Sequence, residues 1–379
     1  MTAVCAPPRH TVGEIFRQHG ETYRSLWRPT PLQDRVLDAL AACRTEALGG
    51  YVDSCDVCDY RRIRFNPCRN RHCPGCGGHL AAEWVEQRRA QTLPVGHYHL
   101  VFTLPSELRD LAFENARLVY AAMLRCAGRV VVSVGRSKKG VGAQVGVTTV
   151  LHTWTRDLSY HPHVHCIVTS GGLSEDADEW RPCPREAYFA PNALLAARFR
   201  GALLRALVYA HRQGSLRFAG GCRALGEPGA FGRLRASLFK KSWHVYVKAP
   251  FGDPETLFRY LGHYTHRIAI SNGRIVAGTD HHVTFRTKDG ATITLDVLVF
   301  IGRFLTHVLP KGFVKIRHYG LYASANAGRL AIARELLGFS PSGTEPTFDQ
   351  ELPEPDATPT RCPACMFGFL TTAELAPYT

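Results

Sequence analysis

The fold is decided by residues 159–169, which read SYHPHVHCIVT. Strand-forming residues follow Pro162, and the period of two in histidine and valine indicates a strand. Side chains two apart on a strand point to the same face of a sheet. His163 and His165 can therefore hold one cation together, while Val164 packs underneath.

Several other segments predict further strands and helices. The strand-like segments are 99–104, 145–153 and 243–247, and a hairpin is expected over 283–295 with Asp289-Gly290 as its turn. The helical segments are 11–48, a segment that follows strand 99–104 and ends near residue 126, 192–213, about 254–271, 297–308 and 326–337. We expect Gly49-Gly50 to end the first helical segment. The fold class is α+β, an antiparallel sheet flanked by helices and preceded by a small helical and zinc-binding domain.

Residues 51–79 are too poor in aliphatic side chains to form a core unless a metal holds them. Cys55-x2-Cys58 and Cys73-x2-Cys76 enclose fourteen residues, a spacing typical of a tetrahedral thiolate site. Four thiolates leave no open coordination position. The sequence therefore predicts a structural zinc held by Cys55, Cys58, Cys73 and Cys76.

Four residues between these cysteine pairs have alternative interpretations. Cys68 and His72 either replace a zinc ligand, bind a second ion or are plain surface residues. Arg69 and Arg71 either form a rigid basic tip that binds phosphates or lie in a solvated loop. Further along, residues 340–360 are rich in proline and acidic residues and predict a linker, followed by a tail in which Cys362-x2-Cys365 makes half a metal site.

A third histidine is the candidate that would complete the strand-borne pair. His152 lies on the preceding predicted strand and is a reasonable third ligand, although a histidine bonded within the core is an equally plausible interpretation. His161 is the other neighbour, but Pro162 breaks the strand beside it. Imidazoles leave coordination positions that water and phosphate oxygens can fill, so the expected cation is Mg²⁺ or Mn²⁺.

Tyr260 and Tyr264 lie one turn apart on a segment with clear helix ends, Asp253-Pro254 and Asn272-Gly273. An aromatic stripe in the core is the plain interpretation. The polar residues 265–267 around Tyr264, Arg267 among them, favour a reactive phenol instead, because they can lower its pKa or bind a phosphate. A metal-bound histidine pair and a tyrosine hydroxyl are the groups that cut a nucleic-acid strand through a phosphotyrosine intermediate.

The charge of the chain agrees with a polyanionic partner. Its 379 residues hold 46 lysines and arginines against 32 acidic residues, a formal charge of +14, which favours nucleic acid. We find no apolar stretch of membrane-spanning length and expect a cytoplasmic, nucleoid-associated protein with no membrane partner. Thirteen cysteines, several of them in C-x2-C pairs, are better explained by metal than by disulfides in a reducing compartment.

The chain resembles the rolling-circle (HUH, tyrosine) transposases of bacterial insertion sequences, the family of insertion sequence ninety-one, whose members carry an N-terminal zinc-binding domain. The matching motifs are CRNRHCPGC at 68–76, VFTLP at 101–105, LHTW at 151–154, HPHVH at 161–165, YLGHYTHRIAISN at 260–272, LPKGF at 309–313 and IRHYG at 316–320. The resemblance covers nearly the whole chain. It implies an HUH-type sheet, with a zinc-binding domain over 1–90, a catalytic domain over 91–339 and a tail over 340–379.

The resemblance also implies an activity. His163 and His165 match the metal-binding pair, Tyr264 the nucleophile, and Tyr260 the second tyrosine that some members use. The expected enzyme is a DNA transposase that nicks and rejoins single-stranded or hairpin DNA at element ends, through a 5′-phosphotyrosine, and joins it to target DNA.

Two alternatives remain at this stage. A plasmid rolling-circle replication initiator or relaxase shares the same chemistry, although the cysteine segment and the Tyr-x3-Tyr helix favour transposition. A non-catalytic zinc-containing DNA-binding protein would use the same histidines and tyrosines as core residues.

Overall fold

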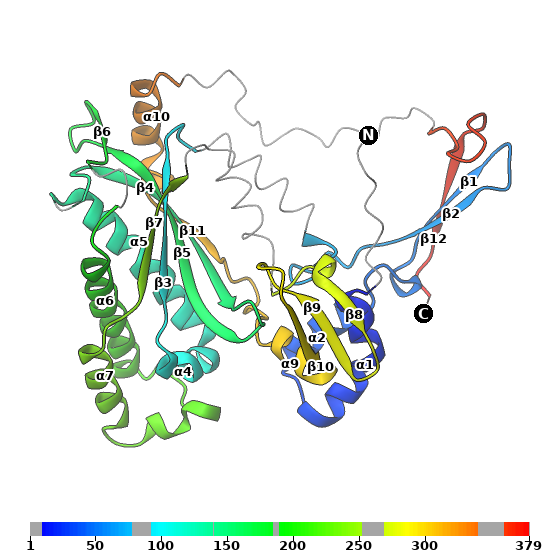
Figure 1. Ribbon diagram of the computed structural model, residues 1–379, viewed down its shortest axis with the longest axis horizontal. Coiled ribbons are helices and arrows are strands. Elements are labelled where there is room, and N and C mark those ends of the chain that lie inside the picture. Colours follow the sequence, from blue (N-terminus) through cyan, green and yellow to red (C-terminus); the bar gives the residue numbers. More distant parts are fainter. Residues whose placement is uncertain are drawn as a thin grey trace. The chain divides into compact units, whose positions relative to one another are not determined.

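The computed structural model describes residues 10–77, 92–138, 140–184, 189–251, 269–339 and 360–378 (Figure 1). Their contacts divide the chain into two units. The first contains residues 10–77, 270–308 and 360–378, and the second contains the described residues of 92–269 together with 309–339. This division differs from the three consecutive domains that we expected, because 270–308 and the C-terminal tail both pack with the N-terminal segment.

The second unit is built on a six-stranded antiparallel sheet. Its main path runs β11 (Ile316–Gly320), β4 (Gln144–Trp154), β5 (Tyr160–Leu173), β3 (His97–Thr103) and β7 (Val245–Phe251), and the short β6 (Trp180–Pro182) pairs with the end of β5. The long pair β4 and β5 lies at its centre. Helices and antiparallel sheets together confirm the predicted α+β class.

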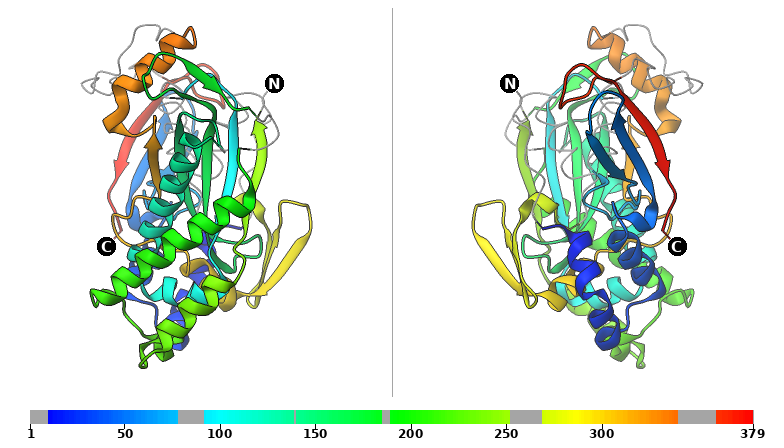
Figure 2. Two further views of the ribbon diagram at one scale, coloured as in Figure 1. Left: turned by 90° about the vertical axis from the view of Figure 1, so that its left-hand side faces the viewer. Right: turned by 90° about the vertical axis from the view of Figure 1, so that its right-hand side faces the viewer.

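Several helices of the second unit lie on one side of this sheet (Figure 2, left). They are α4 (Arg109–Glu114), α5 (Ala116–Arg136), α6 (Asn192–Arg212) and α7 (Ala230–Lys240), with short 3-10 turns at Ser106–Leu108 and Gly220–Gly226. Helix α10 (Ala327–Leu336), preceded by a 3-10 turn at Ser324–Asn326, lies on the other face, where it lines a cavity with Thr148 and His318. Helix α5 packs against β4 and α6. Phe102 of β3 meets Phe199 of α6 with ring centroids 5.0 Å apart. The hydrophobic core of the unit lies between these helices and the sheet.

Helix α5 corrects one sequence expectation. It is long and apolar enough in composition to cross a membrane, although we found no such stretch in the sequence. However, 67% of its apolar window is buried inside the structure. The protein therefore uses α5 as the central helix of a core.

The first unit begins with two helices that have side-chain caps at their N-termini. Helix α1 (Val12–Trp27) starts after Thr11, whose hydroxyl accepts from the Glu14 amide, and α2 (Pro31–Ala41) starts with a capping box between Thr30 and Gln33. Helix α2 ends at Ala41, before the predicted stop. Gly49 instead follows a 3-10 turn (Glu46–Leu48) with φ of 64°.

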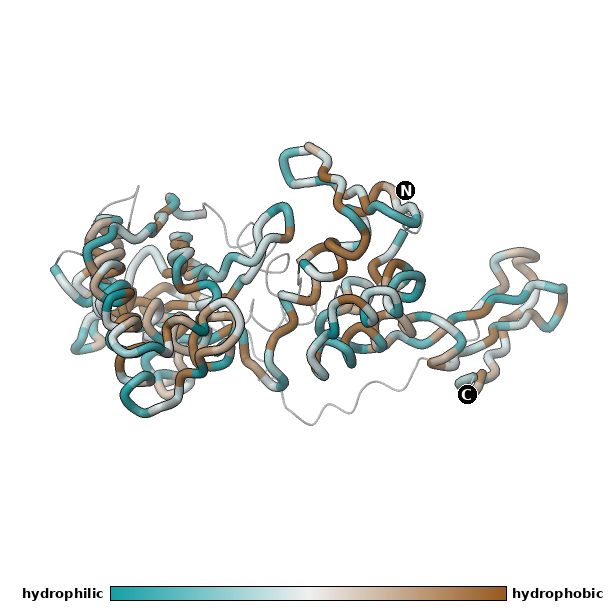
Figure 3. The backbone as a smooth tube through the Cα atoms, turned by 90° about the horizontal axis from the view of Figure 1, so that it is seen from below, coloured by the Kyte–Doolittle hydropathy of each residue, from teal (hydrophilic) through white to brown (hydrophobic). Residues whose placement is uncertain are grey.

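The first unit also contains a small sheet and a third helix. The strands are β8 (Ile275–Gly278), β9 (His282–Arg286) and β10 (Thr292–Asp296), in the order β10-β9-β8, preceded by a 3-10 turn at Asn272–Arg274. Helix α9 (Val297–Leu305) follows, and its Phe304 meets Phe16 of α1 edge to face at 5.2 Å. Figure 3 shows hydrophobic positions inside each unit and many hydrophilic positions on the outer loops.

The first unit also contains a second three-stranded sheet, which we call the ribbon. It has the order β12-β1-β2, made by β12 (Leu370–Leu375), β1 (Gly50–Cys55) and β2 (Arg61–Phe65). Both neighbours pair antiparallel with β1. The C-terminal tail is therefore a strand of the N-terminal cysteine segment rather than a separate domain.

Candidate metal centres and catalytic site

Three histidines meet on the two central strands of the second unit. His152 of β4 pairs directly with His163 of β5, and His165 lies two residues further along the same face. The ring centroid of His165 is 4.3 Å from that of His152 and 4.8 Å from that of His163. One nitrogen from each ring lies within 4.8 Å of the other two. The arrangement is a triangle of nitrogen donors on one sheet face.

Hydrogen bonds orient two of these rings. The Nδ1 atom of His163 lies 2.7 Å from the backbone oxygen of His161, and the Nδ1 atom of His165 lies 2.7 Å from Nε2 of His99. A histidine that binds a metal through one nitrogen commonly donates its other N–H to such an acceptor. Both rings are thereby held with Nε2 as the nitrogen offered to a cation.

The electrostatic environment keeps the imidazoles in their metal-binding form. Burial lowers the pKa of His163 to about 4. Burial, followed by the charges of Lys248 and His163, lowers the pKa of His99 to about 4 as well. Both rings are neutral at pH 7, as nitrogen coordination requires. Three nitrogen donors fill only part of a coordination sphere, so water or phosphate oxygens could occupy the rest.

His99 is a member of this site that the sequence analysis did not identify. It lies on β3, the neighbour of β5 on the side away from β4, and its ring stacks on that of His165 at a centroid distance of 5.0 Å. A signal was present, because His97-Tyr98-His99 repeats the spacing of His163 and His165. Only the strand register shows that His99 and His165 share a face.

His161, the other candidate ligand, is engaged elsewhere. Its Nδ1 atom accepts from the Arg109 guanidinium at 2.7 Å. Burial and then the Arg109 charge lower the pKa of His161. It is not part of the triangle of nitrogen donors in the described chain.

The predicted tyrosines cannot be placed in this geometry. Tyr260, Tyr264 and Arg267 fall in residues 252–268, outside the described residues. Strand β7 leads up to this segment from the edge of the sheet, next to β3. Their roles therefore stay predictions from sequence.

The first unit contains two groups of four cysteines instead of the one that we predicted. We call the first the inner cluster, made of Cys43, Cys68, Cys73 and Cys76. The sulfur of Cys76 lies 3.7 Å from those of Cys43 and Cys68, and Cys43 and Cys73 are 3.6 Å apart. Zn–S bonds of 2.3 Å arranged tetrahedrally place sulfurs about 3.8 Å apart. The inner cluster therefore fits a zinc ion.

The thiols of the inner cluster also oppose one another's ionisation. Hydrogen bonds to the sulfurs of Cys43 and then Cys68, followed by burial and by the charges of these sulfurs, raise the pKa of the Cys73 thiol. A second thiolate beside an existing one is unfavourable without a positive charge between them. A zinc ion supplies that charge and allows all four thiols to ionise.

The predicted zinc ligand set requires a correction. Cys73 and Cys76 join Cys43 and Cys68, whereas Cys55 and Cys58 join Cys362 and Cys365. Strand β1 and strand β2 separate the tip that carries Cys55 and Cys58 from the rest of the segment, so the two C-x2-C pairs are not neighbours. Of the alternative ligands, Cys68 belongs to the inner cluster. Among the described residues His72 belongs to neither cluster, and its Nδ1 lies 3.0 Å from Asn70 Oδ1.

The two predicted phosphate-binding arginines flank the inner cluster. Arg69 and Arg71 are both exposed, in the loop between Cys68 and Cys73. Arg69 adopts a left-handed backbone with φ of 51°. Cys68 and Cys73 of the inner cluster thus hold the loop at either end, and phosphate binding by these arginines stays a prediction.

Two protein-family models match the chain. The family model described as "Transposase zinc-binding domain" matches residues 15–104, and the one described as "Putative transposase" matches residues 146–329. "Putative transposase y4qJ" of Sinorhizobium fredii is 41% identical over 378 residues, covering 96% of this chain and 95% of its own length.

A second relative belongs to a named mobile element. The "Transposase for insertion sequence element IS801" of Pseudomonas savastanoi pv. phaseolicola is 26% identical over 360 residues, covering 92% of this chain and 85% of its own length. No solved structure matches the chain significantly. The zinc-binding domain, the histidine-bearing sheet and these relatives agree, and the chain belongs to the insertion sequence ninety-one (IS91) family of transposases.

Proposed function

We propose that this transposase nicks and rejoins single-stranded DNA at the ends of its element by metal-assisted tyrosine transesterification, as in rolling-circle transposition. The observation that supports this most is the convergence of His152, His163 and His165 on two paired central strands. They form a partial donor set rather than a closed one, and burial keeps the His163 ring neutral at pH 7 by lowering its pKa to about 4. A divalent cation bound there, Mg²⁺ or Mn²⁺, would supply charge to polarise a scissile phosphate.

The covalent step is assigned to Tyr264. Its phenolic oxygen loses a proton and attacks the phosphorus in line, forming the P–Oη bond while the bond from phosphorus to the 3′ oxygen breaks. The leaving 3′ oxygen takes up a proton, and the 5′ phosphate stays on the enzyme. Reversal with another 3′ hydroxyl rejoins the strand without a nucleotide cofactor, because the phosphotyrosine conserves the bond energy.

Two further residues on the same segment have supporting roles in this proposal. Tyr260, four positions before Tyr264, accepts a second strand, so one chain can hold two ends. Arg267 binds the attacked phosphate by charge and hydrogen bonds.

The substrate is single-stranded or hairpin DNA, joined to target DNA in the cytoplasm at the nucleoid. The formal charge of +14 supports electrostatic binding to the phosphate backbone. Arg69 and Arg71, exposed beside the inner cluster, contact that backbone. Affinity should therefore fall steeply as salt rises.

A covalent adduct assay tests the proposal. The zinc-loaded full chain is incubated with Mn²⁺ and single-stranded DNA that carries an element end and a label on the 3′ side of the cleavage site, then run on a denaturing gel. We expect labelled protein that disappears with EDTA and with Tyr264→Phe, while the matched Tyr260→Phe variant still forms it. No adduct from folded, metal-loaded protein would favour a non-catalytic DNA-binding protein. An adduct labelled only through the 5′ side of the cut would mean a 3′-phosphotyrosine and a different enzyme class.

A further inference from the structure

We propose that the chain binds a second structural zinc through Cys55, Cys58, Cys362 and Cys365, and that this ion fastens the C-terminal tail to the N-terminal segment. We call these four residues the outer cluster. The Sγ atom of each lies within 4.8 Å of the Sγ atoms of all the others. The zinc-binding family model ends at residue 104 and so does not include the two C-terminal ligands.

The sulfur positions fit a tetrahedral ion. Cys55 and Cys365 have sulfurs 3.8 Å apart, and Cys58 and Cys362 have sulfurs 3.7 Å apart. These distances match the edge of about 3.8 Å expected around zinc. They are nearly twice the length of a disulfide bond, about 2.05 Å, so the cysteines are not cross-linked to one another.

The backbone around the outer cluster is shaped like two metal-binding turns. The Val57 amide points at the Cys55 sulfur at 3.4 Å, and the Gly368 amide points at the Cys365 sulfur at 3.3 Å. N–H groups directed at sulfur stabilise the thiolate form that binds metal. A Cβ on Gly368 would lie 2.5 Å from the Cys55 sulfur, so the two turns are in close contact.

The ribbon has too little core to hold the tail by hydrophobic packing. Ile63 of β2 is 57% exposed, and four of the six residues of β12 are exposed. At the tip, Met366 and Phe367 are 62% and 81% exposed. Small sheets without a buried face are unstable alone, and a bound metal is the usual substitute for a core.

Polar contacts also join the strands of the ribbon. The buried Asp53 carboxylate accepts from Arg64 at 2.6 and 2.7 Å and from the Thr372 hydroxyl at 2.9 Å. Through Asp53, these hydrogen bonds connect β1 to both β2 and β12. The outer cluster joins them again at the tip, where Cys58 and Cys362 are 304 positions apart in sequence. A metal that closes so long a loop gives a large stabilisation, because it removes much unfolded-state freedom.

Zinc counting on the full chain tests this proposal. We expect two zinc ions per chain, one after Cys362→Ser with Cys365→Ser, one after Cys43→Ser with Cys73→Ser, and two in the control Cys183→Ser, a half-buried cysteine outside both clusters. Cobalt titration of the unaltered chain counts the thiolate sites without any substitution that could unfold the protein. Thiolate-to-cobalt absorption should saturate at two equivalents. Saturation at one, or two zinc ions in the Cys362/Cys365 variant, would overturn the outer site.

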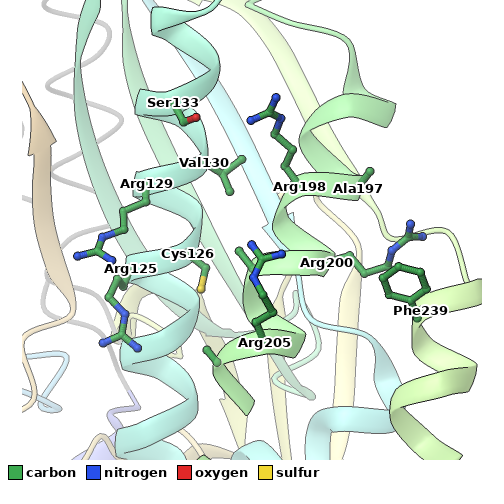
Figure 4. A pocket seen from close by; sticks show the side chains of 13 residues that line it. Arg125, Cys126, Arg129, Val130, Ser133, Ala197, Arg198, Arg200, Arg205 and Phe239 are labelled. Carbon is green, nitrogen blue, oxygen red and sulfur yellow. The ribbon is translucent and has the colours of Figure 1, made fainter. Parts of the chain in front are cut away.

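A second inference rests on a groove between α5 and α6, which we call the arginine groove. It has a volume of about 730 Å³. Figure 4 shows arginine side chains from both helices around it. The lining arginines are Arg125, Arg129, Arg198, Arg200 and Arg205, and its lining contains no acidic residue.

Among the arginines of the groove, Arg200 has a structural role. Arg200 donates to the backbone oxygen of Lys241 at 2.9 Å and lies over the Phe239 ring at 5.0 Å. Five guanidinium groups in one groove repel each other unless an anion lies between them. Guanidinium groups favour phosphates, which they bind bidentately.

The arginine groove lies on the other face of the sheet from the histidines. Val101 of β3 pairs with His165, so its neighbour Phe102 points to the opposite face, where it meets Phe199 of α6. We infer that the groove binds the phosphate backbone of a DNA segment away from the scissile phosphate. This inference rests on the proposed function.

Salt-dependent binding separates this inference from the catalytic proposal. The variant combines Arg125→Ala, Arg198→Ala and Arg205→Ala, and the control is Arg212→Ala, an exposed arginine at the end of α6. With a labelled oligothymidine, we expect the salt slope of log K to fall by about 2, from roughly 0.7 per lost phosphate contact. Adduct formation at saturating DNA should persist. An unchanged salt slope in the triple variant would refute DNA binding by the arginine groove. Absence of the adduct in the unaltered chain would refute the proposed function instead.

Discussion

His152 of β4 lies directly opposite His163 of β5, and their ring centroids are 5.4 Å apart and nearly perpendicular. Two strands joined by a short connection thus bring a third donor to the His163 and His165 pair. The relationship predicts that His152 is a metal ligand rather than a core histidine.

The first prediction is that His152→Ala weakens Mn²⁺ binding by more than the roughly 10–100-fold loss typical of outer partners of a metal site. Free Mn²⁺ is measured by electron paramagnetic resonance during titration of zinc-loaded protein. His318→Ala is the control, because His318 of β11 lies in the same sheet, with its ring 3.0 Å from the Thr148 hydroxyl and outside the cluster. Equal affinity in both variants would remove His152 from the ligand set.

The second prediction concerns His99 as a positioning residue. His99→Ala should weaken Mn²⁺ binding by about 10–100-fold, because the His165 ring loses the 2.7 Å bond that orients it. His99→Gln keeps an acceptor and should recover most of that affinity. If the two variants bind Mn²⁺ equally weakly, the residue acts through packing and not through its hydrogen bond.

The sequence predicted the central strands of the large sheet because their residues follow a simple period. Predicted strands 99–104, 145–153 and 163–169 correspond to β3 (His97–Thr103), β4 (Gln144–Trp154) and β5 (Tyr160–Leu173), whereas the strands β6 and β11 were not predicted. Helix α5 runs to Arg136, ten residues beyond the expected end. Alternation and capping residues are local signals, so they locate an element but not its last turn.

The metal sites were only half predictable, for a reason that follows from their construction. A C-x2-C pair is visible in sequence because one tight turn holds both sulfurs. Which two pairs share an ion depends on the fold, and here Cys55 pairs with Cys365 across 310 positions. Cys43 was missed because it stands alone after α2. His99 was missed because only strand register relates it to His165.

The third prediction tests the packing of edge strand β11 on α5. A Cβ on Gly128 of α5 would lie 2.3 Å from the Tyr319 ring, so Gly128→Ala must displace that ring or the helix. We expect a loss of about 1–3 kcal/mol in the free energy of unfolding, measured by urea denaturation. The control is Gly232→Ala in α7, where nothing lies within 4 Å and alanine favours the helix. Equal stability of the two variants would contradict the contact.

The final prediction is that His97 makes the free energy of unfolding depend on pH. Burial lowers the pKa of His97 to about 4, and its Nε2 lies 2.9 Å from the Tyr322 hydroxyl. The unfolded chain, with a histidine pKa of about 6.5, binds more protons between these two values, so stability rises with pH across that window. The contribution of His97 is complete above pH 6.5 and is lost as the pH falls towards 4.

Urea unfolding at pH 7 and pH 5, followed by tryptophan fluorescence, measures this contribution. For one histidine with these pKa values the loss between the two pH values is about 2 kcal/mol. His97→Gln keeps a hydrogen-bonding group but cannot titrate, so its loss should be smaller than that of the parent by this amount. His244→Gln, at an exposed position, should leave the parent's pH dependence unchanged. If His97→Gln behaves like His244→Gln, His97 is not the group whose protonation destabilises the second unit.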